Sequence, residues 1–200
     1  MARLLVIYAH PSHRSSSVNR PMAEAAKAIE GIEFVDLYAT YPRHDIDIAA
    51  EQARLLSADV ILLQFPLFWY SVPSLLKEWI DLCLEHGFAY GHGGDRLAGK
   101  TLMLALTAGG ADEAYTQNGY QHYPLRTFLT PLEQTARLCQ MQFAAPYVLY
   151  GSIKAPGAGQ VPAHVAGYER LLMAIRDDRY DLGVAADVIA ADTLLVLGDA

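Results

Sequence analysis

DVILLQFPLFWYSVPSLLKEWID, residues 59–81, predicts a strand, a loop and a helix in succession. Residues 59–65 form a short apolar run typical of a buried strand, whereas apolar side chains recur at helical spacing over residues 74–86. Three consecutive aromatic residues, 68–70, occupy the intervening loop, where a polar sequence is expected. The succession indicates an α/β fold, and the aromatic loop raises the question of what it contacts.

The same alternation of strand and helix patterns continues through the chain. Near-continuous apolar strands separated by helices predict a parallel sheet covered on both faces. We therefore expect a flavodoxin-like α/β fold, a three-layer sandwich around a five-stranded parallel sheet of order 2-1-3-4-5. Thr130, Pro131 and Glu133 predict the start of the fourth helix, with Thr130 as its N-cap. Strands are expected at residues 3–9, 32–38, 59–65, 101–107 and 147–151, and helices at 19–30, 48–57, 74–86, 131–142 and 163–177.

Composition and charge limit the classes of protein. The chain has 200 residues, of which 52% are hydrophobic, and this suits one compact core. A net charge of −7 argues against general binding to nucleic acid or anionic membranes. Cys83 and Cys139 fit neither a disulfide framework nor a CxxC pair, which indicates a reduced, cytoplasmic compartment. The apolar span at residues 60–76 contains a glutamine and two prolines, and we do not expect it to cross a membrane.

Three unusual segments follow strands 1, 3 and 4. Ligands in such sheets bind at the carboxyl ends of the strands, so these segments should line one crevice. The first, HPSHRSSSVN (10–19), lacks the GxGxxG and GxxxxGK[ST] fingerprints. Its hydroxyl groups and the free N–H groups of a helix start suit a phosphate monoester. The alternative is an ordinary N-cap rich in Ser and Asn.

The other two segments suit a flat ring. The aromatic loop, PLFWY (66–70), offers π-faces to a large flat ligand, although an aromatic cluster can also form core or a dimer patch. In TAGGADEAY (107–115), the glycines let the main chain approach a ligand, although a Gly-Gly pair alone is usually only a turn. A phosphate-holding turn, an aromatic wall and a glycine platform together predict a site for flavin mononucleotide (FMN).

Four stretches carry a resemblance to a known family. YAHPSHRSSSVN, QFPLFWYSVPSLLKEWID, GFAYGHGG and LTAGGADEAY resemble the flavodoxin-like NAD(P)H:quinone oxidoreductases. Within them the sequence is most similar to the ancillary oxidoreductases of bacterial glutathione-regulated potassium-efflux antiporters, and it is also similar to modulator of drug activity B. The resemblance covers about residues 3–178. It implies one flavodoxin-like domain at 1–180 and a C-terminal tail of unknown role at 181–200.

The resemblance also implies an activity. It indicates an FMN-dependent enzyme that transfers hydride from NAD(P)H through the flavin to a quinone, by a ping-pong mechanism, with FAD as the less favoured cofactor. Family members are homodimers, and an antiporter partner would hold the protein at the inner face of the cell membrane. The alternative is a regulatory ancillary subunit of such an antiporter, with redox activity secondary. A one-electron flavodoxin-type carrier ranks lowest, because Arg14 and Arg20 flank the phosphate turn in place of an acidic face.

The family's cofactor contacts are carried over by position. Ala108 stands where the family usually has threonine, so one hydroxyl contact is lost while the backbone contacts remain. The phosphate and ribityl contacts fall on His10, Ser16, Ser17, Val18 and Asn19, and the ring contacts fall on Leu67, Phe68, Trp69, Tyr70, Thr107, Ala108, Gly109 and Gly110.

The resemblance also assigns residues to the reaction. Tyr115 matches a tyrosine that assists hydride transfer. The assisting histidine should lie about six residues later, where the chain has Gln121 followed by His122, so we take His122 for this role. Tyr90 and His92 would contact the substrate from the partner subunit. The histidines show no metal-ligand spacing, and we expect no metal.

Overall fold

The computed structural model describes residues 1–183. Its sheet is parallel and has the order β2-β1-β3-β4-β5, with β6 also paired to β4. The predicted fold class and strand order are confirmed. The strands are β1 (Leu4–Tyr8), β2 (Ile32–Asp36), β3 (Val60–Pro66), β4 (Thr101–Thr107), β5 (Gln142–Phe143) and β6 (Tyr147–Leu149).

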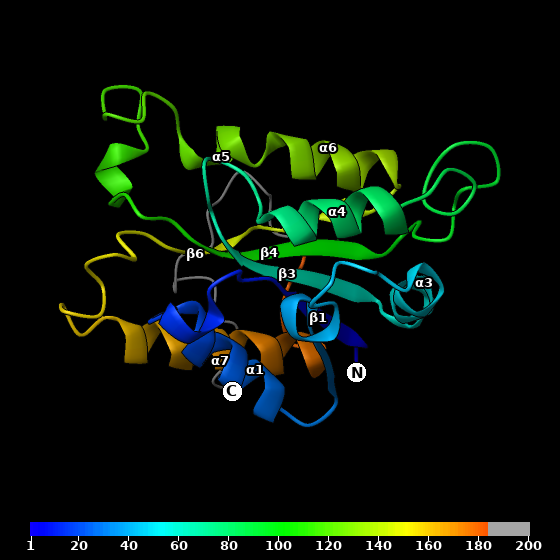
Figure 1. Cartoon of the computed structure of the whole chain (residues 1–200), viewed down its shortest axis with the longest axis horizontal. Helices are drawn as coiled ribbons and strands as arrows, with labels where there is room; N and C mark the ends of the chain where they lie inside the picture. The colour runs from blue at the N-terminus through cyan, green and yellow to red at the C-terminus, as the bar shows by residue number, and fades with distance from the viewer. Residues whose placement is uncertain (184–200) are drawn as a thin grey trace.

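Helices cover both faces of the sheet. Figure 1 shows α1 and α7 on one face and α4 and α6 on the other. Among residues 1–183, no helix is long and apolar enough to cross a membrane. The helices are α1 (Asn19–Ala28), α2 (Leu37–Thr40), α3 (Ile48–Ser57), α4 (Ser74–Cys83), α5 (Leu125–Phe128), α6 (Thr130–Leu138) and α7 (Val161–Arg176), with 3-10 turns at His13–Ser15 and Asp112–Ala114.

The central strands are continuous apolar runs because both of their faces are buried. Every residue of β1, β3 and β4 is buried. Alternate side chains point to opposite faces of a strand. Leu5 and Ile7 accordingly belong to the core cluster beneath α3, α4 and α6, whereas Leu4 and Val6 belong to the one beneath α1 and α7.

The edge strand beyond β4 differs from the prediction. The sequence predicts one strand at 147–151, but two short strands share this position, β5 and β6, which pair with opposite ends of β4. Pro146 lies between them and has no N–H to donate to the ladder. Proline therefore accounts for the interruption.

The fourth predicted helix was wrong at both ends. Its N-cap is Leu129 and not Thr130, whose hydroxyl donates to the carbonyl of Thr127, because the short helix α5 ends directly before it. The helix stops at Leu138 and not at residue 142, since Gln140 takes a φ of +58° and the Met141 N–H donates back to the Ala136 carbonyl. This is a Schellman ending, which closes a helix.

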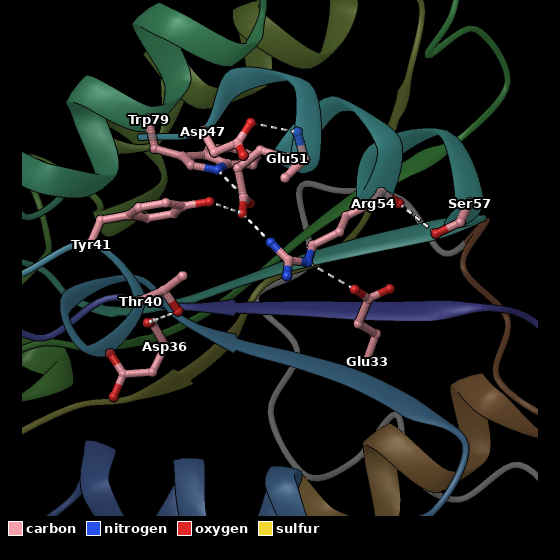
Figure 2. A network of polar contacts seen from close by, with 10 residues as sticks. Glu33, Asp36, Thr40, Tyr41, Asp47, Glu51, Arg54, Ser57 and Trp79 are labelled. Carbon is pink, nitrogen blue, oxygen red and sulfur yellow. Dashed lines mark hydrogen bonds and ion pairs between the residues drawn. The ribbon is translucent and has the colours of Figure 1, made fainter. Parts of the chain in front are cut away.

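A buried carboxylate joins three segments on the α3 and α4 face (Figure 2). Glu51 of α3 is fully buried and accepts hydrogen bonds from the Tyr41 hydroxyl at 2.6 Å and from Trp79 Nε1 at 2.9 Å. Arg54, one turn along α3, donates to the same carboxylate and also to Glu33 of β2. Glu51 thus anchors α4, the helix that follows the aromatic loop.

We predict that Glu51→Ala destabilises the fold strongly. The substitution leaves the buried Trp79 N–H and Tyr41 O–H without their acceptor and removes one of the two carboxylate partners of Arg54. Breaking a buried pair in this way costs roughly 3–5 kcal/mol. Urea unfolding of both proteins gives the difference. Glu78→Ala removes an exposed pair with His44 and serves as the control, with an expected loss below about 1 kcal/mol. Equal losses in the two variants would contradict the anchoring role.

Candidate active site

The turn after β1 presents free donors at the start of α1. Ser15 and Ser16 donate back within the turn, but the backbone N–H groups of Ser17, Val18 and Asn19 find no acceptor among residues 1–183. The Ser16 hydroxyl instead accepts from the Arg20 N–H at 3.3 Å. Free N–H groups at the positive end of a helix dipole form a site for an anion.

A chain of buried hydrogen bonds fixes the start of α1 against the sheet. Asn19 Nδ2 donates to Thr107 Oγ1 at 2.8 Å, at the end of β4. Gln64 of β3 donates from Nε2 to the Asn19 carbonyl at 2.9 Å, and its Oε1 accepts from the Tyr168 hydroxyl at 3.1 Å. All four residues are buried. The phosphate turn and the glycine segment are therefore held together through Asn19.

One acceptor in this series of hydrogen bonds, Asn19 Oδ1, has no partner among the described residues. Asn19 is 2% exposed. A buried acceptor without a partner carries a free-energy cost of about 1–3 kcal/mol. A ligand hydroxyl that donates to Oδ1 would remove this cost, so Asn19 suits a polyol chain joined to a phosphate.

His10 lies at the end of β1 and is neutral. Its Nδ1 accepts from the Ser12 N–H at 3.1 Å, which leaves the proton on Nε2. The ring meets the Phe68 ring edge-on, with centroids 5.8 Å apart. Burial, and secondly the nearby His13, lower the pKa of His10 below its ordinary value of 6.5. The contact with Phe68 joins the phosphate turn to the aromatic loop.

The aromatic loop is a strained two-residue turn. Phe68 and Ser71 form an antiparallel bridge with two hydrogen bonds of 3.0 Å. Between them, Trp69 and Tyr70 have φ values of +48° and +64°. Positive φ at both central residues defines a type I′ turn, which favours Asn-Gly, and the left-handed region costs about 1–2 kcal/mol for each other residue.

The turn presents the side chains of Trp69 and Tyr70 to the surface. Trp69 is 91% exposed, while the Tyr70 ring stacks on Phe128 with centroids 4.8 Å apart. The backbone N–H groups of Trp69 and Tyr70 have no acceptor among residues 1–183. Strain that persists with exposed aromatic rings and free donors is typical of a binding loop.

The glycine segment extends the carboxyl end of β4. Residues 151 and 152 donate backbone N–H groups to the carbonyls of Gly110 and Ala108, while the N–H of Gly109 finds no acceptor in the described chain. A Cβ built on Gly109 would lie 3.3 Å from Cδ1 of Ile153, and one on Gly110 only 2.7 Å from the nearest side-chain atom. Glycine at these two positions leaves room for the side chains that pack against the segment.

Tyr115 lies beside this platform in an aromatic cluster. Its ring contacts Phe128 edge-on at 6.2 Å and Tyr150 at 5.7 Å between centroids. Burial raises the pKa of the Tyr115 hydroxyl, and the Gly110 backbone acts in the opposite direction. The hydroxyl consequently keeps its proton well above neutral pH and can donate. The Tyr150 hydroxyl is buried without a partner among residues 1–183.

The roles expected for His122, Tyr90 and His92 stay predictions. His122 is exposed, and no hydrogen bond or ring contact joins its imidazole to another described residue. Tyr90 and His92 precede β4, so they lie at the amino end of the sheet, opposite the platform, as Figure 1 shows for the segment between α4 and β4. Within residues 1–183, no group of three or more His, Cys, Asp or Glu side chains could hold a metal ion.

Some residues at this edge were missed from the sequence. Phe128, Tyr150 and Ile153 lie about 20 to 45 positions beyond the glycines. Tyr150 falls in the strand predicted at 147–151, and nothing in the sequence around the three residues marks a site. The one available signal was that a segment following the last strand also ends at the carboxyl edge of a parallel sheet.

A family model described as flavodoxin-like fold matches residues 2–172. The chain belongs to this family. It is 42% identical over 171 residues to the glutathione-regulated potassium-efflux system ancillary protein KefG of Cronobacter sakazakii, covering 86% of this chain and 92% of that protein. It is 44% identical over 147 residues to the ancillary protein KefF of Klebsiella aerogenes, with 74% and 82% covered.

Solved structures share the fold. General stress protein 14 of Treponema denticola, in complex with FMN, has a TM-score of 0.78 at 31% identity, with 88% of this chain and 98% of that chain covered. An NADPH-quinone reductase of P. pentosaceus has a TM-score of 0.75 at 26% identity, covering 85% and 97%. A structure described as a thermophilic tryptophan halogenase of Streptomycin violaceusniger has a TM-score of 0.81 at 39% identity, covering 84% and 96%.

We predict that the double variant Trp69→Asn, Tyr70→Gly is more stable than the native chain when no flavin is present. Asn-Gly relieves the backbone strain, although the stacking of Tyr70 on Phe128 is lost. The expected net gain is about 1 kcal/mol in the free energy of unfolding. Added FMN, the cofactor expected from the sequence, should bind less tightly to this variant than to the native chain, as measured by quenching of flavin fluorescence. A variant that is less stable and binds FMN normally would contradict the assignment of the strain to binding.

We predict that His10 lowers stability at acidic pH. Because burial depresses its pKa, the unfolded chain takes up a proton near pH 6.5 before the folded chain does. Stability from this group is therefore present above pH 6.5 and declines as the pH falls, by up to about 1.4 kcal/mol per pH unit. Urea unfolding from pH 7.5 to 5 should show a smaller decline in His10→Asn. The control variant, His122→Asn, changes an exposed histidine and should lose as much stability between pH 7.5 and 5 as the native protein. If His10→Asn loses as much as well, His10 is not the source of the pH dependence.

Proposed function

We propose that this chain is an FMN-dependent NAD(P)H:quinone oxidoreductase. One observation carries the proposal: three loops that contact one another at the carboxyl edge of the sheet combine backbone donors without acceptors, a buried acceptor without a donor, and exposed aromatic rings. The start of α1 suits a phosphate, Asn19 Oδ1 suits a polyol, and the aromatic and glycine segments suit a flat ring. The FMN bound by the Treponema relative and the reductase named in P. pentosaceus support the assignment.

The phosphate end is formed by the start of α1. The free N–H groups of Ser17, Val18 and Asn19 would hold the phosphate, with the Ser16 hydroxyl beside them. Asn19 Oδ1 would accept from a ribityl hydroxyl, which satisfies a group that is otherwise buried without a partner. His10 offers the proton on Nε2 as a further donor.

The ring end lies between the aromatic turn and the glycine segment. The N–H groups of Trp69, Tyr70 and Gly109 would meet the polar edge of the isoalloxazine, where negative charge develops on reduction. Leu67 and Phe68 complete one wall, and Thr107, Ala108 and Gly110 complete the other. Donors held in place before the reaction stabilise this charge without reorganisation.

FMN, when bound, supplies the two-electron redox chemistry, and the chain positions the reactants. NAD(P)H and the quinone would use the same open face in turn, which gives ping-pong kinetics. Tyr115 keeps the proton on its hydroxyl because it is buried, and would donate a hydrogen bond to the oxygen of the acceptor. His122, which lies in the same loop, would assist Tyr115 in this role.

The choice of FMN over FAD needs a direct measurement. A hollow of about 510 Å³ borders the phosphate turn and is lined by residues 10–15 together with Asp36, Tyr38 and Ala39. This space would admit a larger cofactor next to the turn. Chromatography of the cofactor released by heat identifies it directly, and we expect FMN.

A second function is favoured by the curated relatives. KefG and KefF are named as ancillary proteins of potassium-efflux systems. By analogy, this chain would bind a potassium-efflux antiporter at the cytoplasmic face of the membrane and regulate it, as a homodimer in which Tyr90 and His92 reach the partner's substrate site. Co-purification of an antiporter with this protein tests the regulatory role.

We predict that the purified protein shows the absorbance of bound flavin. Anaerobic NADH or NADPH should bleach the blue band, and a quinone should restore it. Initial rates measured at several quinone concentrations should give the parallel reciprocal plots of a ping-pong reaction. A protein that stays colourless after incubation with FMN would refute the enzyme assignment and would favour the regulatory function. A flavin that does not react with NAD(P)H would favour a different redox partner.

A further inference from the structure

The segment after the glycine platform is folded by its own hydrogen bonds. The Thr116 hydroxyl donates to the Glu113 carbonyl at 3.1 Å and accepts from the Gly119 N–H at 2.9 Å. The Gln121 N–H donates to the Ala114 carbonyl at 3.2 Å. A Cβ on Gly119 would lie 2.3 Å from the Ala114 carbonyl oxygen, so only glycine fits there. These contacts therefore constrain the loop backbone at the next residue, Tyr120.

The Tyr120 hydroxyl lies at the glycine platform. A Cβ built on Gly110 would lie 2.7 Å from the hydroxyl oxygen of Tyr120 and 3.1 Å from Cε2 of Tyr115. Two tyrosines from one loop thus converge on the same glycine, beside the site proposed for the flavin ring. Among residues 1–183, the imidazole of His122 forms no hydrogen bond or ring contact with either of them.

We propose that the Tyr120 hydroxyl, which lies against Gly110 beside Tyr115, donates the one further proton that the quinone needs, in the role that the family resemblance assigns to a histidine. This inference rests on the proposed function. The observation that carries it is the position of the Tyr120 hydroxyl, 2.7 Å from the place of a Cβ on Gly110, in a loop whose backbone Gly119 constrains.

The step balances. Conversion of a quinone to a hydroquinone takes one hydride, which carries two electrons and one proton from NAD(P)H by way of the reduced cofactor, and one further proton. Tyr120 gives that proton from its O–H to the acceptor oxygen and regains one from water. The Tyr120 side chain is 69% exposed, so water reaches it for this return. Tyr115, which is 7% exposed, is less suited to rapid exchange with solvent and better suited to hold the substrate oxygen.

The test compares Tyr120→Phe with Tyr123→Phe. Tyr123 lies in the same loop, is 56% exposed and meets Phe128 edge-on at 6.1 Å, so its variant is a matched loss of one hydroxyl. Stopped-flow measurements follow reduction of the FMN-loaded protein by NADPH and its reoxidation by 1,4-benzoquinone separately. Binding of 1,4-hydroquinone to the oxidised protein is measured in parallel by fluorescence quenching, which reports the contact without turnover.

In Tyr120→Phe we expect reoxidation to slow about tenfold or more, because a positioned proton donor typically contributes about 10² to 10⁴. The dissociation constant of hydroquinone should rise several-fold. FMN binding and reduction by NADPH should stay within about twofold of the native values, and Tyr123→Phe should match the native protein in every measurement.

Three outcomes would overturn the inference. Native reoxidation in Tyr120→Phe with slow reoxidation in His122→Asn would return the role to the histidine. Equal slowing of both half-reactions would show a structural effect of the loop. A native chain that binds no FMN would show this in its first spectrum, and it would refute the proposed function together with the role of Tyr120.

Discussion

The line of buried hydrogen bonds from Tyr168 through Gln64 and Asn19 to Thr107 fixes the geometry of the whole carboxyl edge. It joins α7, β3, α1 and β4, four elements that are far apart in sequence. Buried polar groups must be paired, so each member restricts the position of the next. The start of α1 and the end of β4 cannot move independently, and the loops that they carry keep their spacing without a ligand.

The positions of the central strands could be predicted because each of them carries its own signal, and their order follows from the flavodoxin-like arrangement. β1, β3 and β4 are buried on both faces and read as unbroken apolar runs. The edge beyond β4 could not be predicted in the same way. Its two strands are only two and three residues long, and their positions depend on pairing with β4. The end of α6 at Gln140 was equally hidden, because glutamine gives no sign of a left-handed conformation.

The candidate site was predictable as three loops but not as a set of contacts. Residues 10–19, 66–70 and 107–110 stand out because serine, aromatic and glycine runs are unusual after buried strands. The lack of a partner for Asn19 Oδ1 and the strain of the aromatic turn arise only in the folded protein, and no residue type in the sequence predicts them. Neighbours such as Phe128 reach the site through tertiary packing alone.

The interruption at Pro146 also bears on how these molecules meet in a crowded cell. An unbroken border strand offers a row of unpaired N–H and C=O groups, to which another chain can add in a growing ribbon. Here the border is divided between β5 and β6, and proline lacks the donor that such an addition would need. Uncontrolled edge-to-edge growth is therefore disfavoured on this side, and the helical faces are left as the better surfaces for specific assembly.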